Sequence, residues 1–334
     1  MPVMNMIQAV NDALKIEMRR DARVLVMGED VGKFGGVFRA TLGLFEEFGP
    51  DRSIDTPLSE GGIIGTAIGM AVYGMKPVAE IQFSDYIFPG FDQIVNEMAK
   101  YRYRSGGQYP CAMVVRAPSG GGIRGGHYHS QSPEAYFIHT AGLKVVMPSN
   151  PIDAKGLLAS SIRAEDPVIF FEPKRVYRGR PVKGRIEPWD TDVPEGEYLV
   201  PLEKANVLRE GNHVTVVSWG AMVHESIEAV RIAAEEDGVE CDLIDLRTLW
   251  PVDVECLVAS VKKTGRIVIV HEAPKTCGFG AELMALVNER AFVHLEAPPV
   301  RVTGWDTPFP YTLEMDYMPH VPRILKAVRE TAKY

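Results

Sequence analysis

One carboxylate, Glu60, has an unusual sequence environment. It lies in DTPLSEGGIIGTAIGMAVYG (residues 55–74), where a proline-containing loop leads into small and apolar residues. One interpretation is that Ser59 caps a helix and Glu60 complements its positive end, an effect of under about 1 kcal/mol at an exposed site. The other is that burial raises the pKa of the carboxyl, so that it can share a proton with a ring nitrogen. The local pattern alone favours the helix cap.

Polar and aromatic side chains follow a strand that we expect at residues 78–83. They are Gln82, Phe83, Asp85 and Tyr86. Open α/β sheets bind ligands in the crevice at the carboxyl ends of their strands, where these side chains would lie. Aromatic rings there can stack on a planar cofactor, although an isolated aromatic cluster more often fills the core. Glu29 and Asp30, which end an earlier strand, are either solvated loop acids or acids that face the same crevice.

A glycine-rich segment, Gly120 to Gly126, precedes His127 and His129. Its spacing matches neither a P-loop nor a GxGxxG turn, so we expect a mobile active-site loop and not a phosphate cradle. The two imidazoles could contribute to a metal site, but no third ligand has a suitable spacing. His129 is therefore either a surface hydrogen-bonding residue or a proton donor.

The elements that would position these residues alternate between helices and strands. Asn5 can cap a helix with an apolar face, and the apolar run at 24–27 predicts a buried strand. A helix-like segment at 92–104 precedes a strand-like segment at 112–116. This alternation is typical of a parallel α/β sheet.

A change in composition predicts a domain boundary. Residues 184–196 (GRIEPWDTDVPEG) are rich in Pro, Gly and acids without apolar periodicity, which is typical of an exposed linker. We expect a first domain at 1–184, a linker at 185–200 and a smaller α/β domain at 201–334. In the second domain, strands are expected at 214–219, 239–246 and 267–272, and helices at 223–236 and 281–290.

The overall composition limits the classes of function. A chain of 334 residues with 46% hydrophobic content can bury more than one core. The formal net charge of −8 and the lack of a Lys/Arg-rich run argue against a nucleic-acid partner. The four cysteines are far apart and form no CxxC pair, which argues against a zinc site or a disulfide framework.

The N-terminal sequence resembles neither a secretory signal nor a transit peptide, and no apolar run approaches the length of a membrane span. We therefore expect a cytoplasmic protein of bacterial type without a membrane partner. A mitochondrial matrix location would require this chain to be a processed form.

Several segments can be recognised together. They are GEDVG (28–32), FGGVFRAT (34–41), DTPLSEGGIIG (55–65), EIQFSDYIFPGFDQIVNEMAKYRYRSG (80–106), HYHSQSPEAYF (127–137), VTVVSWGAMVHESIEA (214–229), DLRTLWPVD (245–253) and HEAPKTCGFGAEL (271–283). They resemble the E1 β subunit of thiamine-diphosphate-dependent 2-oxo acid dehydrogenases, especially the branched-chain enzyme. The resemblance covers nearly the whole chain and implies a transketolase-like pyrimidine-binding domain followed by a smaller transketolase C-terminal domain.

The resemblance also implies the assembly. In an α2β2 heterotetramer, thiamine diphosphate spans an α/β interface, with its aminopyrimidine on β and its diphosphate and Mg²⁺ on α. This chain has no GDG-plus-asparagine diphosphate signature, so the phosphate-holding half must come from an α subunit. The further partners implied are the lipoyl domain and the subunit-binding domain of an E2 component.

The resemblance implies roles for individual residues, according to their positions in the shared motifs. Glu60 matches the family glutamate that hydrogen-bonds the aminopyrimidine ring nitrogen. Gln82 and Tyr86 match positions that line the aminopyrimidine, and Glu29 matches an acid in the nearby polar network. His129 matches a histidine that acts in reductive acylation, where a proton must reach the departing sulfur of the lipoyl disulfide.

A monovalent cation is implied as well, K⁺ held mainly by backbone carbonyls. The positions concerned lie near Ala112, Val114, Ser161, Ala164 and Asp166. Carbonyl ligands leave almost no sequence signature, and Ala164 stands where a family member has an aspartate. The potassium site is therefore a hypothesis for this chain.

The expected function is oxidative decarboxylation of a branched-chain 2-oxo acid and transfer of the acyl group to lipoyl-lysine on E2, only together with an α subunit. One alternative is the β subunit of a pyruvate or acetoin dehydrogenase, because the absent α chain builds part of the substrate pocket. Another is a non-catalytic transketolase-like scaffold, against which the presence of Glu60, Tyr86 and His129 argues.

Overall fold

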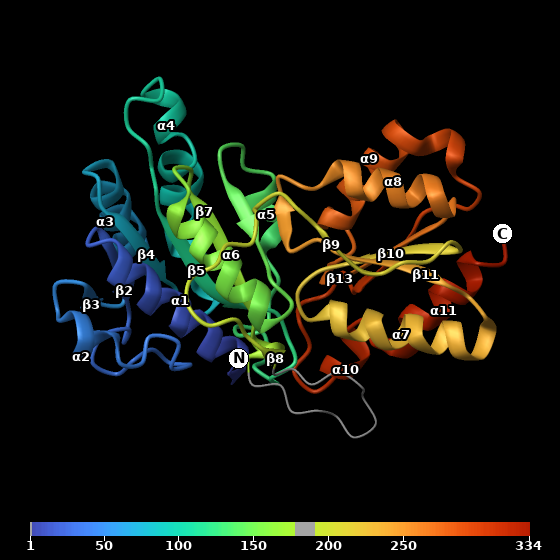
Figure 1. The fold of residues 1–334 in the computed structure, drawn as a ribbon, viewed down its shortest axis with the longest axis horizontal. Coiled ribbons are helices and arrows are strands. Elements are labelled where there is room, and N and C mark those ends of the chain that lie inside the picture. Colours follow the sequence, from blue (N-terminus) through green and yellow to red (C-terminus); the bar gives the residue numbers. More distant parts are fainter. Residues whose placement is uncertain (1, 178–190) are drawn as a thin grey trace.

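The computed structural model describes residues 2–177 and 191–334. Two α/β domains lie side by side, the first coloured blue to green and the second yellow to red (Figure 1). In the described residues, the larger sheet has the strand order β12-β6-β7-β5-β4-β2-β3. Its neighbouring strands are parallel except β12 and β6, which confirms the predicted parallel α/β sheet.

The first sheet is buried on both faces. Its strands are β2 (Val24–Gly28), β3 (Ser53–Asp55), β4 (Lys76–Glu80), β5 (Val114–Ser119), β6 (Lys144–Val146), β7 (Val168–Pro173) and β12 (Thr248–Trp250). The helices around it are α1 (Met6–Arg20), α2 (Leu44–Phe48), α3 (Glu60–Val72), α4 (Tyr101–Arg104), α5 (Glu134–Ile138) and α6 (Pro151–Arg163). Within β2, Val24 and Val26 pack in the core cluster that contains α1 and α6, whereas Leu25 and Met27 pack in the cluster that contains α3.

The second domain has the strand order β14-β13-β10-β11-β9, in which only β9 is antiparallel to its neighbour. Its strands are β9 (Asn206–Arg209), β10 (Val214–Ser218), β11 (Cys241–Asp245), β13 (Ile267–Pro274) and β14 (Val300–Gly304). Its helices are α7 (Met222–Asp237), α8 (Val254–Thr264), α9 (Phe279–Ala291), α10 (Glu314–Tyr317) and α11 (Val321–Thr331). Helices α8 and α9 cover one face of this sheet, and α7 and α11 cover the other (Figure 1). The strands and helices predicted for this domain are confirmed to within a few residues.

Asn5 caps α1 as predicted. Its side chain accepts a hydrogen bond from the Gln8 amide, and the Gln8 side chain accepts one from the Asn5 amide, both at 2.9 Å. This reciprocal pair satisfies two backbone donors that the first turn of a helix leaves open.

Two predicted elements differ from the observed ones. The strand expected at 78–83 ends at Glu80, which leaves Gln82 in the loop that follows. The helix expected at 92–104 is divided into a π-helical turn, Gln93–Met98, and α4, because the Ala99 amide donates to the Ile94 carbonyl five residues back.

The linker expected at 185–200 is only partly within the described residues, since 185–190 lie outside them. Strand β8 (Thr191–Asp192) pairs with β1 (Val3–Met4), and the Val193 side chain that follows is fully buried. Backbone pairing and the burial of Val193 hold the start of this stretch, whereas Glu195, Gly196, Glu197 and Leu199 are exposed. The exposed linker stays a prediction.

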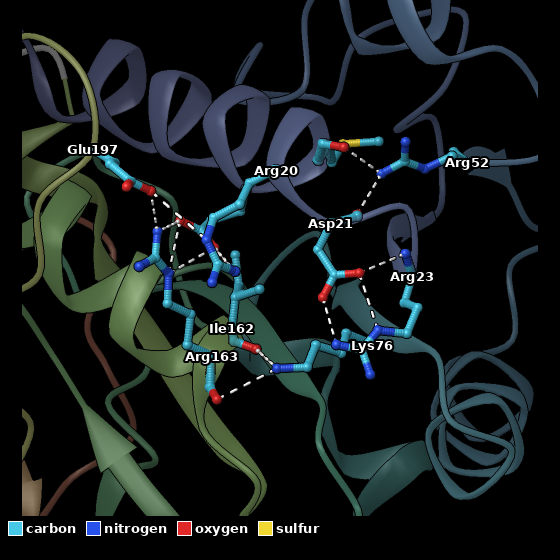
Figure 2. A network of polar contacts seen from close by, with 10 residues as sticks. Arg20, Asp21, Arg23, Arg52, Lys76, Ile162, Arg163 and Glu197 are labelled. Carbon is cyan, nitrogen blue, oxygen red and sulfur yellow. Dashed lines mark hydrogen bonds and ion pairs between the residues drawn. The ribbon is translucent and has the colours of Figure 1, made fainter.

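A polar network ties the ends of α1 and α6 together (Figure 2). Arg163 of α6 pairs with Glu17 of α1 at 2.6 Å and with Glu197 at 2.7 Å. Lys76, at the start of β4, donates to the carbonyls of Ile162 and Arg163 at 3.2 and 3.4 Å. A lysine ammonium thus meets carbonyls that the C-terminal turn of α6 leaves open.

The two domains share structure through β12. This strand follows β11 of the second domain and pairs with β6 of the first sheet. The Met147 amide donates to the Arg247 carbonyl at 2.8 Å, and Leu249 is fully buried. The second domain therefore completes the sheet of the first. None of the helices in the described part of the chain is both long and apolar enough to cross a membrane.

Candidate active site

Parallel strands bring the predicted site residues to one edge of the first sheet. Gly28 at the end of β2 pairs with Glu80 at the end of β4, and Ser119 at the end of β5 pairs with Pro173 at the end of β7. The predicted residues come directly after these ends: Glu29 after β2, Gln82 and Tyr86 after β4, and the loop with His129 after β5. The carboxyl edge of the sheet is therefore the candidate site.

Glu60 is the first residue of α3, and its side chain is partly buried. Ser59 makes no side-chain capping hydrogen bond, so the interpretation of Ser59 as a cap is wrong. One side of the helix faces solvent, since Gly62 and Thr66 are exposed, and Tyr73 at its end is 94% exposed. The Glu60 carboxylate lies at the positive end of the α3 dipole.

Glu29 and Glu60 interact electrostatically although 31 positions separate them in the chain. Burial, followed by the charges of Glu60 and Asp30, raises the pKa of Glu29 above its ordinary value. Gln82 Nε2 donates to Asp30 Oδ2 at 3.3 Å. This group of acids favours a proton or a proton-sharing ligand, because a bound proton relieves the repulsion between carboxylates.

Tyr86 and His129 form a hydrogen-bonded pair. The Tyr86 hydroxyl lies 2.8 Å from His129 Nε2. The Phe83 ring makes edge-to-face contacts with both, with centroid distances of 4.6 Å to His129 and 5.5 Å to Tyr86. One face and one nitrogen of the imidazole are therefore held by residues that follow β4.

The loop between Gly120 and His129 is fastened at several backbone positions. The Gly120 amide donates to the Gln131 carbonyl at 3.0 Å, which closes the loop on itself. The Gly121 amide donates to Glu272 Oε2 at 2.9 Å, and a side chain of the second domain thus holds this loop of the first. Mobility of the loop stays a prediction.

His127 and His129 have different partners. His127 Nδ1 lies 2.7 Å from the Phe309 carbonyl, whereas His129 faces Tyr86. The described residues contain no group of three or more His, Cys, Asp and Glu side chains placed to hold a metal ion. A metal role for the two histidines has no geometric support within this part of the chain.

The positions expected for K⁺ lie at the end of α6 and the start of β5. The Ser161 carbonyl accepts a hydrogen bond from the Ala164 amide at 3.3 Å, and the Asp166 carboxylate pairs with Arg102 at 2.7 Å. Ala112 and Val114 are buried. The adjacent Ile162 carbonyl accepts a hydrogen bond from the Lys76 ammonium, so a cationic group is present beside the expected site.

A buried ion cluster supports the sheet beneath the carboxyl edge. Arg116 in β5 pairs with Glu80 of β4 at 2.8 Å and with Glu172 of β7 at 2.6 Å, and all three side chains are at most 4% exposed. Pairing and bidentate hydrogen bonds offset the cost of burying these charges.

Two further buried ionisable residues near this edge were not singled out from the sequence. Lys174 directly follows β7 and is 3% exposed. Glu134, the first residue of α5, is 1% exposed, and burial raises its pKa to about 7. The available signal was the Lys174 position, three residues after the apolar run 168–171.

Two family models match this chain. The transketolase pyrimidine-binding domain matches residues 3–180, and the transketolase C-terminal domain matches residues 203–324. The chain is 55% identical over 332 residues to the mitochondrial 2-oxoisovalerate dehydrogenase subunit beta of Dictyostelium discoideum, an alignment that covers 99% of this chain and 87% of that protein. This chain belongs to the family of 2-oxo acid dehydrogenase E1 β subunits.

The E1 β family includes relatives with other substrates in their names. The pyruvate dehydrogenase E1 component subunit beta of Staphylococcus epidermidis is 47% identical over 335 residues, which cover 100% of both chains. A solved structure described as a split-gene transketolase in an inactive β4 tetramer has a TM-score of 0.79 and 21% identity, and the match covers 99% of each chain. This last likeness shows the fold alone. The expected family and the transketolase-like fold class are confirmed.

Proposed function

We propose that this E1 β chain acts with an α subunit in an α2β2 heterotetramer that decarboxylates a branched-chain 2-oxo acid and acylates lipoyl-lysine on an E2 component. The name of the Dictyostelium relative supports the branched-chain substrate. The observation that carries the catalytic part is the convergence of Glu60 and Glu29 with the Tyr86–His129 pair at one sheet edge.

The residues at this edge fit the aminopyrimidine half of thiamine diphosphate. The raised pKa of Glu29 indicates a group of acids that favours proton sharing. Aromatic rings of Phe83 and Tyr86 border the same region. When bound, thiamine diphosphate supplies the reactive carbon at which the 2-oxo acid loses CO₂. We assign its diphosphate and Mg²⁺ to the α subunit, because this chain lacks the GDG signature.

Each residue then has a defined task. Glu60 holds a shared proton at the aminopyrimidine ring nitrogen, and Glu29 belongs to the neighbouring group of acids. Gln82 and Tyr86 line the aminopyrimidine side. His129 delivers a proton to the departing sulfur when the lipoyl disulfide opens, since an imidazole exchanges protons near neutral pH.

The test is a Glu60→Gln variant co-purified with the α subunit. We expect its decarboxylation rate, measured with an artificial electron acceptor, to fall by at least about 100-fold, because an amide cannot share the proton. The exposed Glu46→Gln serves as the matched control and should retain activity. Full activity of Glu60→Gln, or decarboxylation by the β chain without α, would contradict the proposal.

Pyruvate or acetoin dehydrogenase is the second candidate function, favoured by the 47% identity to a pyruvate dehydrogenase subunit. The discriminating measurement is the ratio of kcat/KM for 2-oxoisovalerate and pyruvate in the reconstituted α/β complex. We expect a ratio above one. A scaffold without activity is tested in the same complex by titration with thiamine diphosphate, which we expect to bind.

We also propose a K⁺ ion at the carbonyls near Ala112, Val114, Ser161, Ala164 and Asp166. The support is that the C-terminal end of α6 is the negative end of its dipole, which favours cations. Replacing NaCl by KCl at equal ionic strength should raise the Tm of the complex. An unchanged Tm would indicate that the Lys76 ammonium already supplies the charge there.

A cytoplasmic location stays a prediction, because one similar relative carries the name of a mitochondrial protein. The proposed E2 partner is recognised through its lipoyl domain at the active site and through its subunit-binding domain elsewhere on the assembly. Pull-down of E2 with the α/β complex tests this assignment.

A further inference from the structure

Lys174 is a buried lysine for which the proposed chemistry has no use. It lies directly after β7, at the carboxyl edge of the first sheet, and is 3% exposed. Its Nζ donates to the Pro118 carbonyl of β5 at 3.3 Å. An ammonium group taken out of water is costly unless opposite charges or hydrogen bonds compensate it.

Three carboxylates reduce that cost through longer-range attraction, and among the described residues none of them is hydrogen-bonded to the Lys174 Nζ. Burial lowers the pKa of Lys174 to about 8, while the charges of Asp85, Glu272 and Glu314 oppose this shift. The ammonium is therefore mostly protonated at neutral pH. Asp85 belongs to the first domain, whereas Glu272 and Glu314 belong to the second. Acids from both domains thus interact with Lys174, and Glu272 also interacts with the neighbouring Arg175.

Each of these carboxylates accepts a hydrogen bond from a backbone amide of one loop, residues 120–131, which we call the glycine loop. Glu272 accepts from the Gly121 amide at 2.9 Å and Glu314 accepts from the Arg124 amide at 3.1 Å. Asp85 Oδ1 accepts from the amides of Ser130 and Gln131, at 3.2 and 3.1 Å. The acids whose charges act on Lys174 are therefore the acids that fasten both ends of the glycine loop.

A second contact leads from Lys174 to His129. The Lys174 Nζ lies 5.7 Å from the centroid of the Phe83 ring, within the range of a cation–π interaction. The same Phe83 ring makes an edge-to-face contact with His129, with the ring centroids 4.6 Å apart. The ammonium is thus connected to His129 through a ring and, independently, through Asp85 and the backbone that flanks the histidine.

We propose that Lys174 is a positioning residue that holds the glycine loop, and with it His129, in the geometry needed for reductive acylation. Without this cation, the repulsion between Glu272 and Glu314 and the buried charge of Asp85 are compensated less in a poorly solvated region, and the hold of these acids on the loop amides weakens. The catalytic consequence rests on the proposed role of His129, whereas the effect on the loop does not.

The test uses Lys174→Met in the α/β complex, a change that keeps an unbranched side chain one atom shorter and removes the charge. The control is Lys155→Met, which removes another buried lysine, paired with Asp12 at 2.7 Å in a part of the fold away from the loop. Hydrogen exchange of the loop amides should accelerate by about tenfold in Lys174→Met and stay unchanged in Lys155→Met.

Kinetics provide the second readout. We expect kcat for acylation of a lipoyl domain to fall by about tenfold or more in Lys174→Met, with a smaller loss in decarboxylation measured with an artificial acceptor. If the wild-type complex does not acylate lipoyl domains, the proposed function fails while hydrogen exchange still tests the loop. Unchanged exchange in Lys174→Met would overturn the inference about Lys174.

A charge-compensating variant distinguishes electrostatic support from loss of packing. Glu314→Gln keeps an acceptor for the Arg124 amide but removes one negative charge. The double variant Lys174→Met/Glu314→Gln should therefore recover part of the loop protection and of the acylation rate, and it also serves if Lys174→Met alone does not fold. A double variant whose loop exchanges faster than that of Lys174→Met, or like an unfolded segment, would contradict the proposal.

Discussion

The Tyr86 hydroxyl is the polar contact that orients the His129 ring, at 2.8 Å from Nε2. Tyr86 follows the end of β4 and His129 follows the end of β5, so residues after two different strands form the pair. At the scale of single residues, the site therefore depends on side chains that restrain one another. A hydrogen bond of this kind contributes only about 1 kcal/mol to stability, but its loss frees the ring to rotate.

Tyr86→Phe should separate orientation from binding. We expect kcat for reductive acylation to fall by about tenfold, with little change in the KM for the lipoyl domain, because only the hydrogen bond is removed. Tyr103→Phe, at a tyrosine that is 91% exposed, is the control. A change confined to KM would indicate that Tyr86 contacts the lipoyl domain and does not orient His129.

Glu134 predicts a pH dependence of stability. Its Oε1 accepts from Trp219 Nε1 at 3.3 Å, while its Oε2 has no hydrogen-bond partner among the described residues. Burial and, to a lesser extent, Glu272 raise its pKa to about 7 from the ordinary 4.5. Between these values the folded state binds more protons than the unfolded state, so stability falls as the pH rises through this window.

Glu134→Gln should remove this dependence. We expect the variant to unfold at a higher temperature than wild type at pH 8, where the wild-type penalty is on the order of 3 kcal/mol, and at a similar temperature at about pH 4, below both pKa values. The exposed Glu289→Gln should follow wild type at both pH values. A variant less stable than wild type at pH 8 would show that the ionised carboxylate is stabilised in the fold.

At the scale of elements, α1 shows how a local signal fixes a helix end. The capping box of Asn5 and Gln8 starts α1 at Met6, and the apolar face behind it packs against α6. The start of α3 differs, since Ser59 makes no capping bond and Glu60 is turned to a cluster of acids. Local sequence therefore specified the first helix end better than the second.

Asn5→Ala should lower the free energy of unfolding by about 1 kcal/mol, because the first-turn amide of Gln8 loses its acceptor. Chemical denaturation of the chain gives this value directly. Asn5→Ser keeps a capping oxygen and should recover most of the loss. If both variants are equally destabilised, the box is not the reason for the helix start.

At the scale of the molecule, β12 makes the two domains cooperative. It leaves the second domain to pair with β6, and its Leu249 is fully buried in a core cluster with residues of both domains. The glycine loop adds a second connection through Glu272. The active-site edge of the first domain is therefore supported by the second.

Calorimetry should accordingly record one unfolding transition for the chain. Leu249→Ala should lower the stability of that single transition by about 3 kcal/mol, because a cavity opens where both domains pack. Leu199→Ala, at a side chain that is 49% exposed, should have a small effect. Two well-separated transitions in the wild-type chain would contradict this coupling.

The sequence alone determined the alternating elements, the Asn5 cap and the family, because apolar periodicity, capping residues and motifs are local in the chain. It placed Glu29, Gln82 and Tyr86 after strands for the same reason. Only the tertiary structure decided that Glu29 and Glu60 interact, that Tyr86 meets His129, and that Lys174 interacts with acids from two domains. These relations depend on strand order and domain packing, which bring together residues that no local pattern connects.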